Sequence, residues 1–200
     1  MKNIISSIVI SALSVISSNS YADCDSGNLL INGSFEKGSL LPSTWETIPG
    51  GDSNSITGWT TEGAGVEWFK FTAETGSMPN GTYAIDLNNH YSTNGGGIQQ
   101  TFATEVGNKY LVKFYASTYK KHGRTGQSKL EIKIGDEHYI YNLNNAGSTL
   151  DWTYFNFTFR ATSTSTTLKL STDTNSLQSF TFVDDVSVIK LDGPKAILIN

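Results

Sequence analysis

The sequence of 200 residues has a single cysteine, Cys24, and therefore no internal disulfide. An exported chain of this kind must be held together by packing, with or without a bound metal. No histidine has a fixed position beside Cys24 in the sequence, which argues against a catalytic thiol. We expect a free thiol near a flexible terminus, and the alternative is a disulfide between two chains that would give a Cys24-linked dimer.

Long apolar runs are also scarce. The one run, at residues 4–16, is preceded by the positive charge of Lys2 and followed by the small-residue motif Ser20-Tyr21-Ala22. This arrangement is typical of a secretory signal peptide and is too short to span a membrane. We expect cleavage after Ala22, a secreted or periplasmic location, no membrane span, and a single domain at residues 23–200 with a core of about 28–190.

The sequence lacks the net positive charge and most of the motifs that several functions need. With 14 basic and 18 acidic residues it has a formal net charge of −4, which argues against nucleic-acid binding. The three histidines, His90, His122 and His138, lack a paired metal-ligand spacing. There is no nucleophile-elbow serine or phosphate-binding loop. Glycoside hydrolysis needs two carboxylates at a defined separation, and no spacing singles out a pair among Glu67, Asp86 and Glu131.

The mature region has no convincing helical period and instead alternates with a period of two. In the segment 109–118, for example, Tyr110, Val112, Phe114 and Ala116 share one face. About ten such segments separated by turn residues predict an all-β fold, an antiparallel β-sandwich of the jelly-roll kind. Residues 28–35 are expected to form a short strand, an Asn-Gly turn and a return, and the other expected strands lie at residues 66–71, 82–87, 97–104, 109–118, 129–134, 138–143, 151–160, 166–172 and 180–189.

The last of these segments contains a charged residue at an inward position. Phe180, Phe182, Val186 and Val188 share one parity and are predicted to face the core, and Asp184 has the same parity. A buried carboxylate is costly unless it is hydrogen-bonded, paired or bound to a cation. A cation, a basic side chain and backbone amides all remain open as its partner.

Several motifs together resemble one family. They are Asn28-Leu-Leu-Ile-Asn-Gly-Ser-Phe-Glu36, Gly58-Trp59, Val66-Glu67-Trp68, Asn80-Gly81, Ala84-Ile85-Asp86-Leu87, the segment 98–104, Trp152 before a run of phenylalanines, and Val183-Asp184-Asp185-Val186-Ser187-Val188. Their order resembles that of the DUF642 and choice-of-anchor C proteins over residues 28–189. The resemblance implies a galactose-binding-like domain, similar to carbohydrate-binding modules, in an exported protein whose plant relatives are associated with cell-wall polysaccharide.

The resemblance also implies a structural calcium ion. In related modules a calcium ion often lies between the N-terminal Phe-Glu segment and the C-terminal aspartates, and the matching positions are Glu36, Asp184 and Asp185. Calcium takes six to eight oxygen ligands, so backbone carbonyls near residues 32–34 would have to contribute. Such an ion would join the two ends of the chain without a disulfide.

A carbohydrate-binding surface needs exposed aromatic rings surrounded by polar groups. Residues Trp59 and Trp152 are expected in the core. His90 belongs to a loop that could frame a pocket. The predicted ligand-binding residues are Trp68, Tyr91, Gln99, Tyr115, Tyr119 and Arg124.

The sequence therefore predicts a non-catalytic carbohydrate-binding protein that recognises a polysaccharide or another glycan. Two other classes stay open: a structural or adhesive matrix protein that binds other proteins, and a glycan hydrolase with an unrecognised site. The basic stretch from Lys120 to Arg124 is interpreted as a solvated loop, with contact to an acidic polysaccharide as the alternative.

Overall fold

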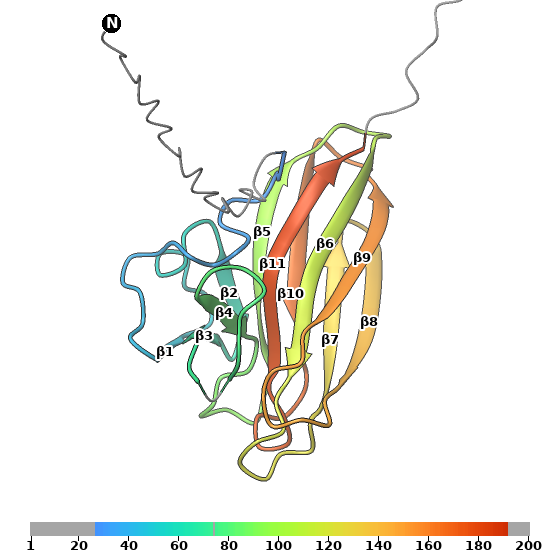
Figure 1. Cartoon of the computed structure of the whole chain (residues 1–200). Helices are drawn as coiled ribbons and strands as arrows, with labels where there is room; N and C mark the ends of the chain where they lie inside the picture. Colours follow the sequence, from blue (N-terminus) through green and yellow to red (C-terminus); the bar gives the residue numbers. More distant parts are fainter. Residues whose placement is uncertain (1–26, 74, 192–200) are drawn as a thin grey trace, which may run out of the picture.

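The computed structural model describes residues 27–73 and 75–191, and these form two antiparallel β-sheets packed face to face (Figure 1). The six-stranded sheet has the order β1-β3-β4-β11-β6-β9, and the five-stranded sheet has the order β2-β5-β10-β7-β8. The strands are β1 (Trp45–Ile48), β2 (Thr60–Gly63), β3 (Val66–Lys70), β4 (Tyr83–Asp86), β5 (Gly96–Ala103), β6 (Lys109–Thr118), β7 (Gln127–Ile134), β8 (Glu137–Asn144), β9 (Thr153–Arg160), β10 (Ser165–Ser171) and β11 (Thr181–Lys190). The predicted all-β sandwich is confirmed.

Side-chain alternation explains how the two sheets share one core. On β6 the residues Tyr110, Val112, Phe114 and Ala116 are all buried between the sheets, as their spacing predicts. Leucines and isoleucines of β7 and β10 face them from the five-stranded sheet. Within the described ranges, no helix is long and apolar enough to cross a membrane. The predicted signal peptide and Cys24 lie outside the described residues.

The N-terminal segment differs from the prediction. The short strand and the return expected within residues 28–35 are absent, and the backbone of Asn28 forms an isolated bridge with Ile189. Asn32 and Phe35 have left-handed backbone angles (φ 57° and 58°), so the chain turns repeatedly instead of extending. The short strands β1 and β2 were not predicted, because they lie in or next to a loop-like sequence rich in Gly, Ser and Thr.

The predicted common inward face of β11 is wrong, and a β-bulge is the reason. The register shifts between Asp184 and Ser187, where Asp185 has a left-handed backbone (φ 49°). An inserted residue reverses which face the following side chains occupy. Val186 and Val188 therefore belong to the core between the sheets. Phe180 and Phe182 instead pack on the outer face of the six-stranded sheet, in the cluster that also contains Ala84, Tyr119, Leu150, Phe69, Met78 and Trp152.

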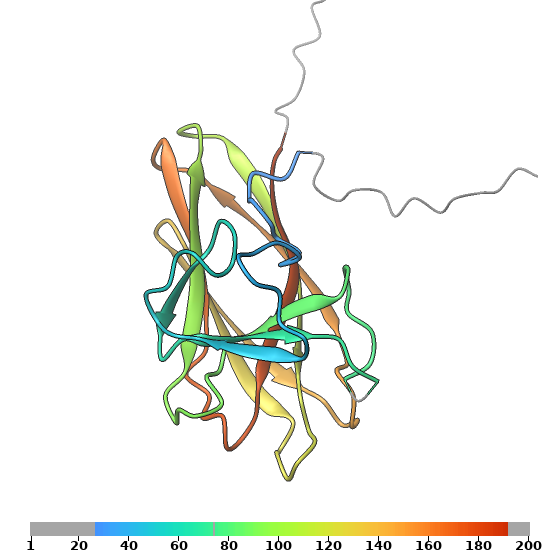
Figure 2. The ribbon, with the colours of Figure 1, turned by 90° about the vertical axis from the view of Figure 1, so that its left-hand side faces the viewer.

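Several long connections gather at one end of the sandwich. Figures 1 and 2 show the β4–β5, β6–β7 and β10–β11 loops together at this end, opposite the end where Asn28 pairs with Ile189. Backbone hydrogen bonds join two of the loops, with Thr125 donating its amide N–H to the carbonyl of Gln178 over 3.0 Å. The side chain of Asn88 donates to the carbonyl of Thr174 over 2.5 Å and brings in the third. The connections are thus fastened to one another.

Candidate ligand-binding site

A pocket of about 320 Å³ opens between these loops and the outer face of the six-stranded sheet. Strands β1 and β3 supply one wall, and the β3–β4, β4–β5, β6–β7 and β10–β11 connections supply the rest. The residues that line it are Trp45, Glu67, Phe69, Thr72, Thr75, His90, Tyr119, His122, Arg124 and Phe180. Its walls combine aromatic rings with a few polar groups, which is the usual composition of a small-molecule site.

Exposed aromatic rings cluster at the rim of the pocket. The ring of Trp45 lies 6.3 Å from those of His90 and Tyr91, and the rings of His90 and Tyr91 are 5.4 Å apart. Tyr91 is 76% exposed and Trp45 is 40% exposed, so both present ring faces to solvent. His90 also lies 5.7 Å from the ring of Phe180, which links the rim to the pocket wall.

Arg124 is held in a fixed orientation inside the pocket. Its Nε donates a hydrogen bond to the carbonyl of Ser176 over 3.0 Å, and its guanidinium carbon lies 3.8 Å from the centre of the Phe180 ring. Partial burial lowers the pKa of Arg124, while the charges of Asp86 and Glu67 act in the opposite direction. The side chain remains cationic because a guanidinium does not lose its proton in the ordinary pH range.

Two carboxyl groups lie side by side beneath the pocket. Glu67 on β3 and Asp86 on β4 are directly opposite each other in the register, and both are buried. Burial raises the pKa of Glu67 to about 7, although the amide of His90 donates to its Oε1 over 3.2 Å. Burial and the charge of Glu67 raise the pKa of Asp86 well above its ordinary value.

One oxygen of Asp86 also lacks a partner. Oδ1 accepts amide hydrogen bonds from Asn88 (3.0 Å) and Thr181 (3.2 Å), whereas among the described residues nothing hydrogen-bonds to the buried Oδ2. A buried oxygen without a donor favours the neutral carboxyl over the carboxylate.

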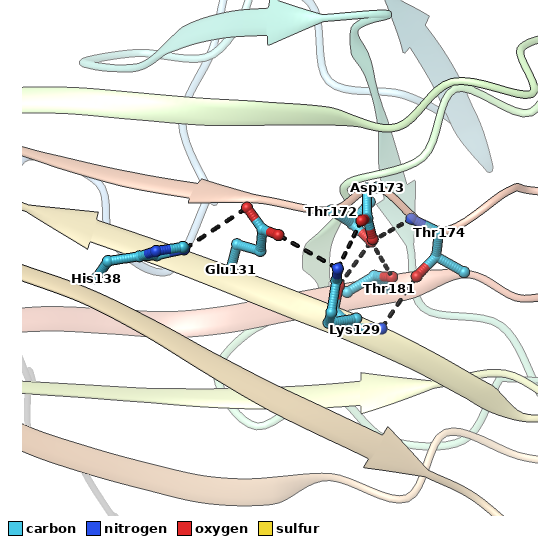
Figure 3. A network of polar contacts seen from close by, with 7 residues as sticks. All are labelled: Lys129, Glu131, His138, Thr172, Asp173, Thr174 and Thr181. Carbon is cyan, nitrogen blue, oxygen red and sulfur yellow. Dashed lines mark hydrogen bonds and ion pairs between the residues drawn. The ribbon is translucent and has the colours of Figure 1, made fainter.

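A polar network on the neighbouring sheet fixes the loop that orients Arg124 (Figure 3). Nζ of Lys129 contacts Asp173 at 2.6 Å and Glu131 at 3.4 Å, and His138 lies 3.7 Å from the other oxygen of Glu131. The hydroxyl of Thr172 donates to the backbone carbonyl of Lys129 over 2.7 Å. This network anchors the start of the loop at residues 172–180, which presents Ser176 and Phe180 to Arg124.

The structure brings together three of the six predicted ligand-binding residues. Tyr91 is at the rim, while Tyr119 and Arg124 line the pocket, with Tyr119 largely buried. Sequence patterns did not indicate Trp45 or Phe180 for this site. Trp45 stands in a loop-like stretch, and the alternation around Phe180 suggested a core residue.

The other three predicted residues lie elsewhere. The proposed ligand contact of Trp68 does not agree with its position, because it is fully buried and donates its indole N–H to the carbonyl of Phe35 over 3.0 Å. Gln99 is on β5 in the other sheet. Tyr115 faces outward beside Tyr154, whose ring is 5.4 Å away, outside the pocket. As predicted, Trp59 is buried in the core. Trp152 was also expected in the core, but it is only partly buried and packs against the smaller cluster on the outer face.

The three acidic residues predicted for calcium converge on one turn. Glu36 Oε1 accepts from the amides of Thr82 (2.8 Å) and Tyr83 (2.7 Å), and Asp184 Oδ2 accepts from the amide of Asn80 over 3.1 Å. Asp185 accepts from the side-chain amide of Asn80 over 2.9 Å. Burial, followed by the charges of Asp185 and Glu36, raises the pKa of Asp184. Backbone amides thus contact the buried carboxylate.

No group of three or more His, Cys, Asp or Glu side chains in the described ranges is arranged to hold a metal ion. The side chains of Glu36, Asp184 and Asp185 nevertheless offer only oxygen atoms as metal ligands, and oxygen is the ligand type that calcium prefers. An ion at this position would therefore need carbonyl or amide oxygens in addition to the carboxylates.

Several solved structures resemble this fold at low sequence identity. TmCBM61, in complex with β-1,4-galactotriose, has a TM-score of 0.47 and 16% identity, over 82% of this chain and 99% of that chain. The xylan-binding CBM22-1 domain of Paenibacillus barcinonensis Xyn10C has a TM-score of 0.47 and 12% identity, over 80% and 93%. The enzymatically active domain of bacteriophage CBA120 tailspike protein 4 has a TM-score of 0.48 and 14% identity, over 82% of this chain but only 22% of that chain.

No curated protein matches the chain. One protein-family model does, the one described as "Protein of unknown function (DUF642)", and its match covers residues 28–189. These limits agree with the resemblance in the sequence motifs, which begins at Asn28 and ends at Ile189. The chain belongs to the DUF642 family.

Proposed function

We propose that this protein binds carbohydrate in the pocket between Trp45 and Arg124 and does not cleave it. The observation that carries the proposal is the combination of exposed rings at the rim with a cation and a carboxyl group inside. A sugar has an apolar ring face and a belt of hydroxyl groups, so rings and polar groups in one pocket match both. A larger hollow of about 440 Å³ over β7 and β8 is less suitable, because none of the described residues that line it is aromatic.

The positions of the carboxyl groups support binding without hydrolysis. Cleavage of a glycosidic bond needs a pair of carboxyl groups, one on each side of the bond. Of the described residues that line the pocket, Glu67 alone carries a carboxyl group. Asp86 is fully buried behind it, and Glu131 lies in the network on β7.

The aromatic rim provides the first test. Trp45→Ala and Tyr91→Ala are each expected to weaken glycan binding about tenfold, or about 1.4 kcal/mol, because each removes a ring that a sugar can stack on. A glycan array followed by calorimetry on the best ligand measures this. Tyr154→Ala is the matched control, since Tyr154 is 46% exposed and lies outside the pocket.

The glycan array and calorimetry, together with an assay of reducing ends released from polysaccharide, separate the alternatives. If Tyr115→Ala and Tyr154→Ala abolish binding while Trp45→Ala has no effect, the site is on the outer face of β6 and β9 and the proposed pocket is wrong. If no glycan binds above background, the protein is better explained as a matrix protein with protein partners. Release of reducing ends from polysaccharide would instead indicate a hydrolase.

We further propose that the protein is exported, because residues 1–22 have the pattern of a signal peptide.

We also propose that a calcium ion binds near Asn80. Glu36, Asp184 and Asp185 would hold the ion, which would supply positive charge between them. Adding calcium at about 100 times its Kd to metal-free protein should raise Tm by about 5 °C.

Thermal melts with and without EDTA measure the calcium effect. Magnesium should give a smaller rise, because it requires near-octahedral geometry and loses its bound waters reluctantly, and Asp184→Asn should abolish the rise. A Tm of the metal-free protein that does not respond to calcium would rule the ion out.

A further inference from the structure

The guanidinium of Arg124 has hydrogen-bond donors that no described residue uses. Arg124 uses Nε for Ser176 and its flat face for Phe180. Among the described residues, no hydrogen bond or ion pair involves its terminal nitrogens. A guanidinium presents a rigid fork that matches the two oxygens of a carboxylate. The two existing contacts fix the plane of this fork at the wall of the pocket.

The two carboxyl groups nearby do not balance this charge below neutral pH. Burial favours the neutral forms of Glu67 and Asp86 more strongly than the charge of Arg124 favours their ionised forms. Among the described residues that line the pocket, the other titratable groups are His90 from the β4–β5 loop and Tyr119 and His122 from the β6–β7 loop. When these two carboxyl groups are neutral, the described residues that line the pocket carry net positive charge, although the whole chain has a formal net charge of −4.

The loop that carries Arg124 contains a further cation close to the pocket-lining residues in the sequence. Lys120 is exposed and lies two residues before His122, which lines the pocket and is itself exposed. Clustered cations around a concave site concentrate field lines and attract anionic ligands. The charge distribution therefore favours a ligand with negative charge.

We propose that the carbohydrate bound in this pocket carries a carboxylate, as a uronic acid residue of an acidic polysaccharide does, and that Arg124 binds this carboxylate through two parallel hydrogen bonds. The sugar ring would lie against Trp45 and Tyr91. This inference rests on the proposed function and specifies its ligand class. It also predicts that affinity increases as pH falls from 8 to 6, because Glu67 gains a proton and no longer repels the ligand, whose own carboxyl titrates far below this range.

The test compares acid sugars with their methyl esters, which keep the ring and hydroxyls but lose the charge. Calorimetry is done with trigalacturonate, a glucuronate-substituted xylo-oligosaccharide, and the methyl ester of each, at pH 6 and pH 8. We expect at least one acid to bind about tenfold more tightly than its ester at pH 6, as a charged, two-point hydrogen bond would give. That preference should fall severalfold at pH 8.

Three variants assign this preference to residues, and a fourth serves as a control. Arg124→Gln should remove the preference for the acid over its ester, and Arg124→Lys should retain only part of that preference, because an ammonium lacks the fork. Glu67→Gln should reduce the difference between the affinities at pH 8 and pH 6. Arg160→Gln removes a cation from β9, outside the pocket, and should change nothing.

The outcomes distinguish this inference from the proposed function. Binding of esters or neutral glycans as tight as that of the acids, lost in Trp45→Ala, would overturn the uronate inference and leave carbohydrate binding intact. Acid preference that survives in a folded Arg124→Gln variant would overturn the role of Arg124. If neither acids, esters nor neutral glycans bind, both proposals fail together.

Discussion

Trp68→Ala is expected to lower the free energy of unfolding by about 4 kcal/mol, since it removes a large buried side chain and leaves a cavity. Trp68 is fully buried, its ring lies 5.7 Å from that of Tyr83, and it packs so closely against Gly38 that a Cβ there would come within 2.2 Å of the indole. The substitution also leaves the carbonyl of Phe35 without its donor. Urea denaturation at pH 7 measures the loss.

Trp45→Ala is the matched control for this prediction. Trp45 is 40% exposed, so its removal should cost about 1 kcal/mol or less. Glycan binding should show the reverse pattern from stability. Folded Trp68→Ala should bind glycan normally, whereas Trp45→Ala should bind it more weakly. A small stability loss for Trp68→Ala would show that the packing around β3 is looser than described.

The stability of the wild-type protein is expected to fall as pH rises from about 4.5 to about 7, because Glu67 has a pKa of 4.5 in an ordinary environment and about 7 in the fold. Below this pH range Glu67 is protonated in both the folded and the unfolded state. Within it the unfolded chain loses the proton while the folded chain retains it, so the unfolded state is favoured. Above it the loss is complete and amounts to about 3 kcal/mol for Glu67.

Glu67→Gln should flatten this part of the pH profile and increase stability at pH 8, because the amide has the same shape and does not titrate. Asp86, whose pKa is also raised by burial, should continue to lower stability as pH rises in both proteins. Glu46→Gln is the control, because Glu46 is exposed on the adjacent β1 and should leave the profile unchanged. Equal slopes for the wild type and Glu67→Gln would show that Glu67 ionises normally in the fold.

Much of the fold could be predicted from local pattern. The segment 109–118 coincides with β6, and most of the other predicted strands differ from the observed ones by a few residues at their ends. Alternation predicts a strand well when one face is buried, because every second residue must then be apolar. It failed at residues 28–35, where left-handed turns bury apolar side chains without a strand.

The site was less predictable, for two reasons. Its residues come from segments between Trp45 and Phe180 in the sequence, and only the fastening of the loops to one another brings them together. An aromatic residue in a strand also looks the same in sequence whether it faces the core, as Trp68 does, or solvent, as Tyr154 does.

By itself the sequence determined the all-β class, the approximate positions of most strands and membership of the family, because these depend on spacing and motifs along the chain. Only the tertiary structure decided which face each side chain occupies after the bulge at Asp185, and which groups share the pocket. It also decided that Glu67 and Asp86 lie together out of water, since burial and the approach of two carboxyl groups across adjacent strands arise only when distant segments pack.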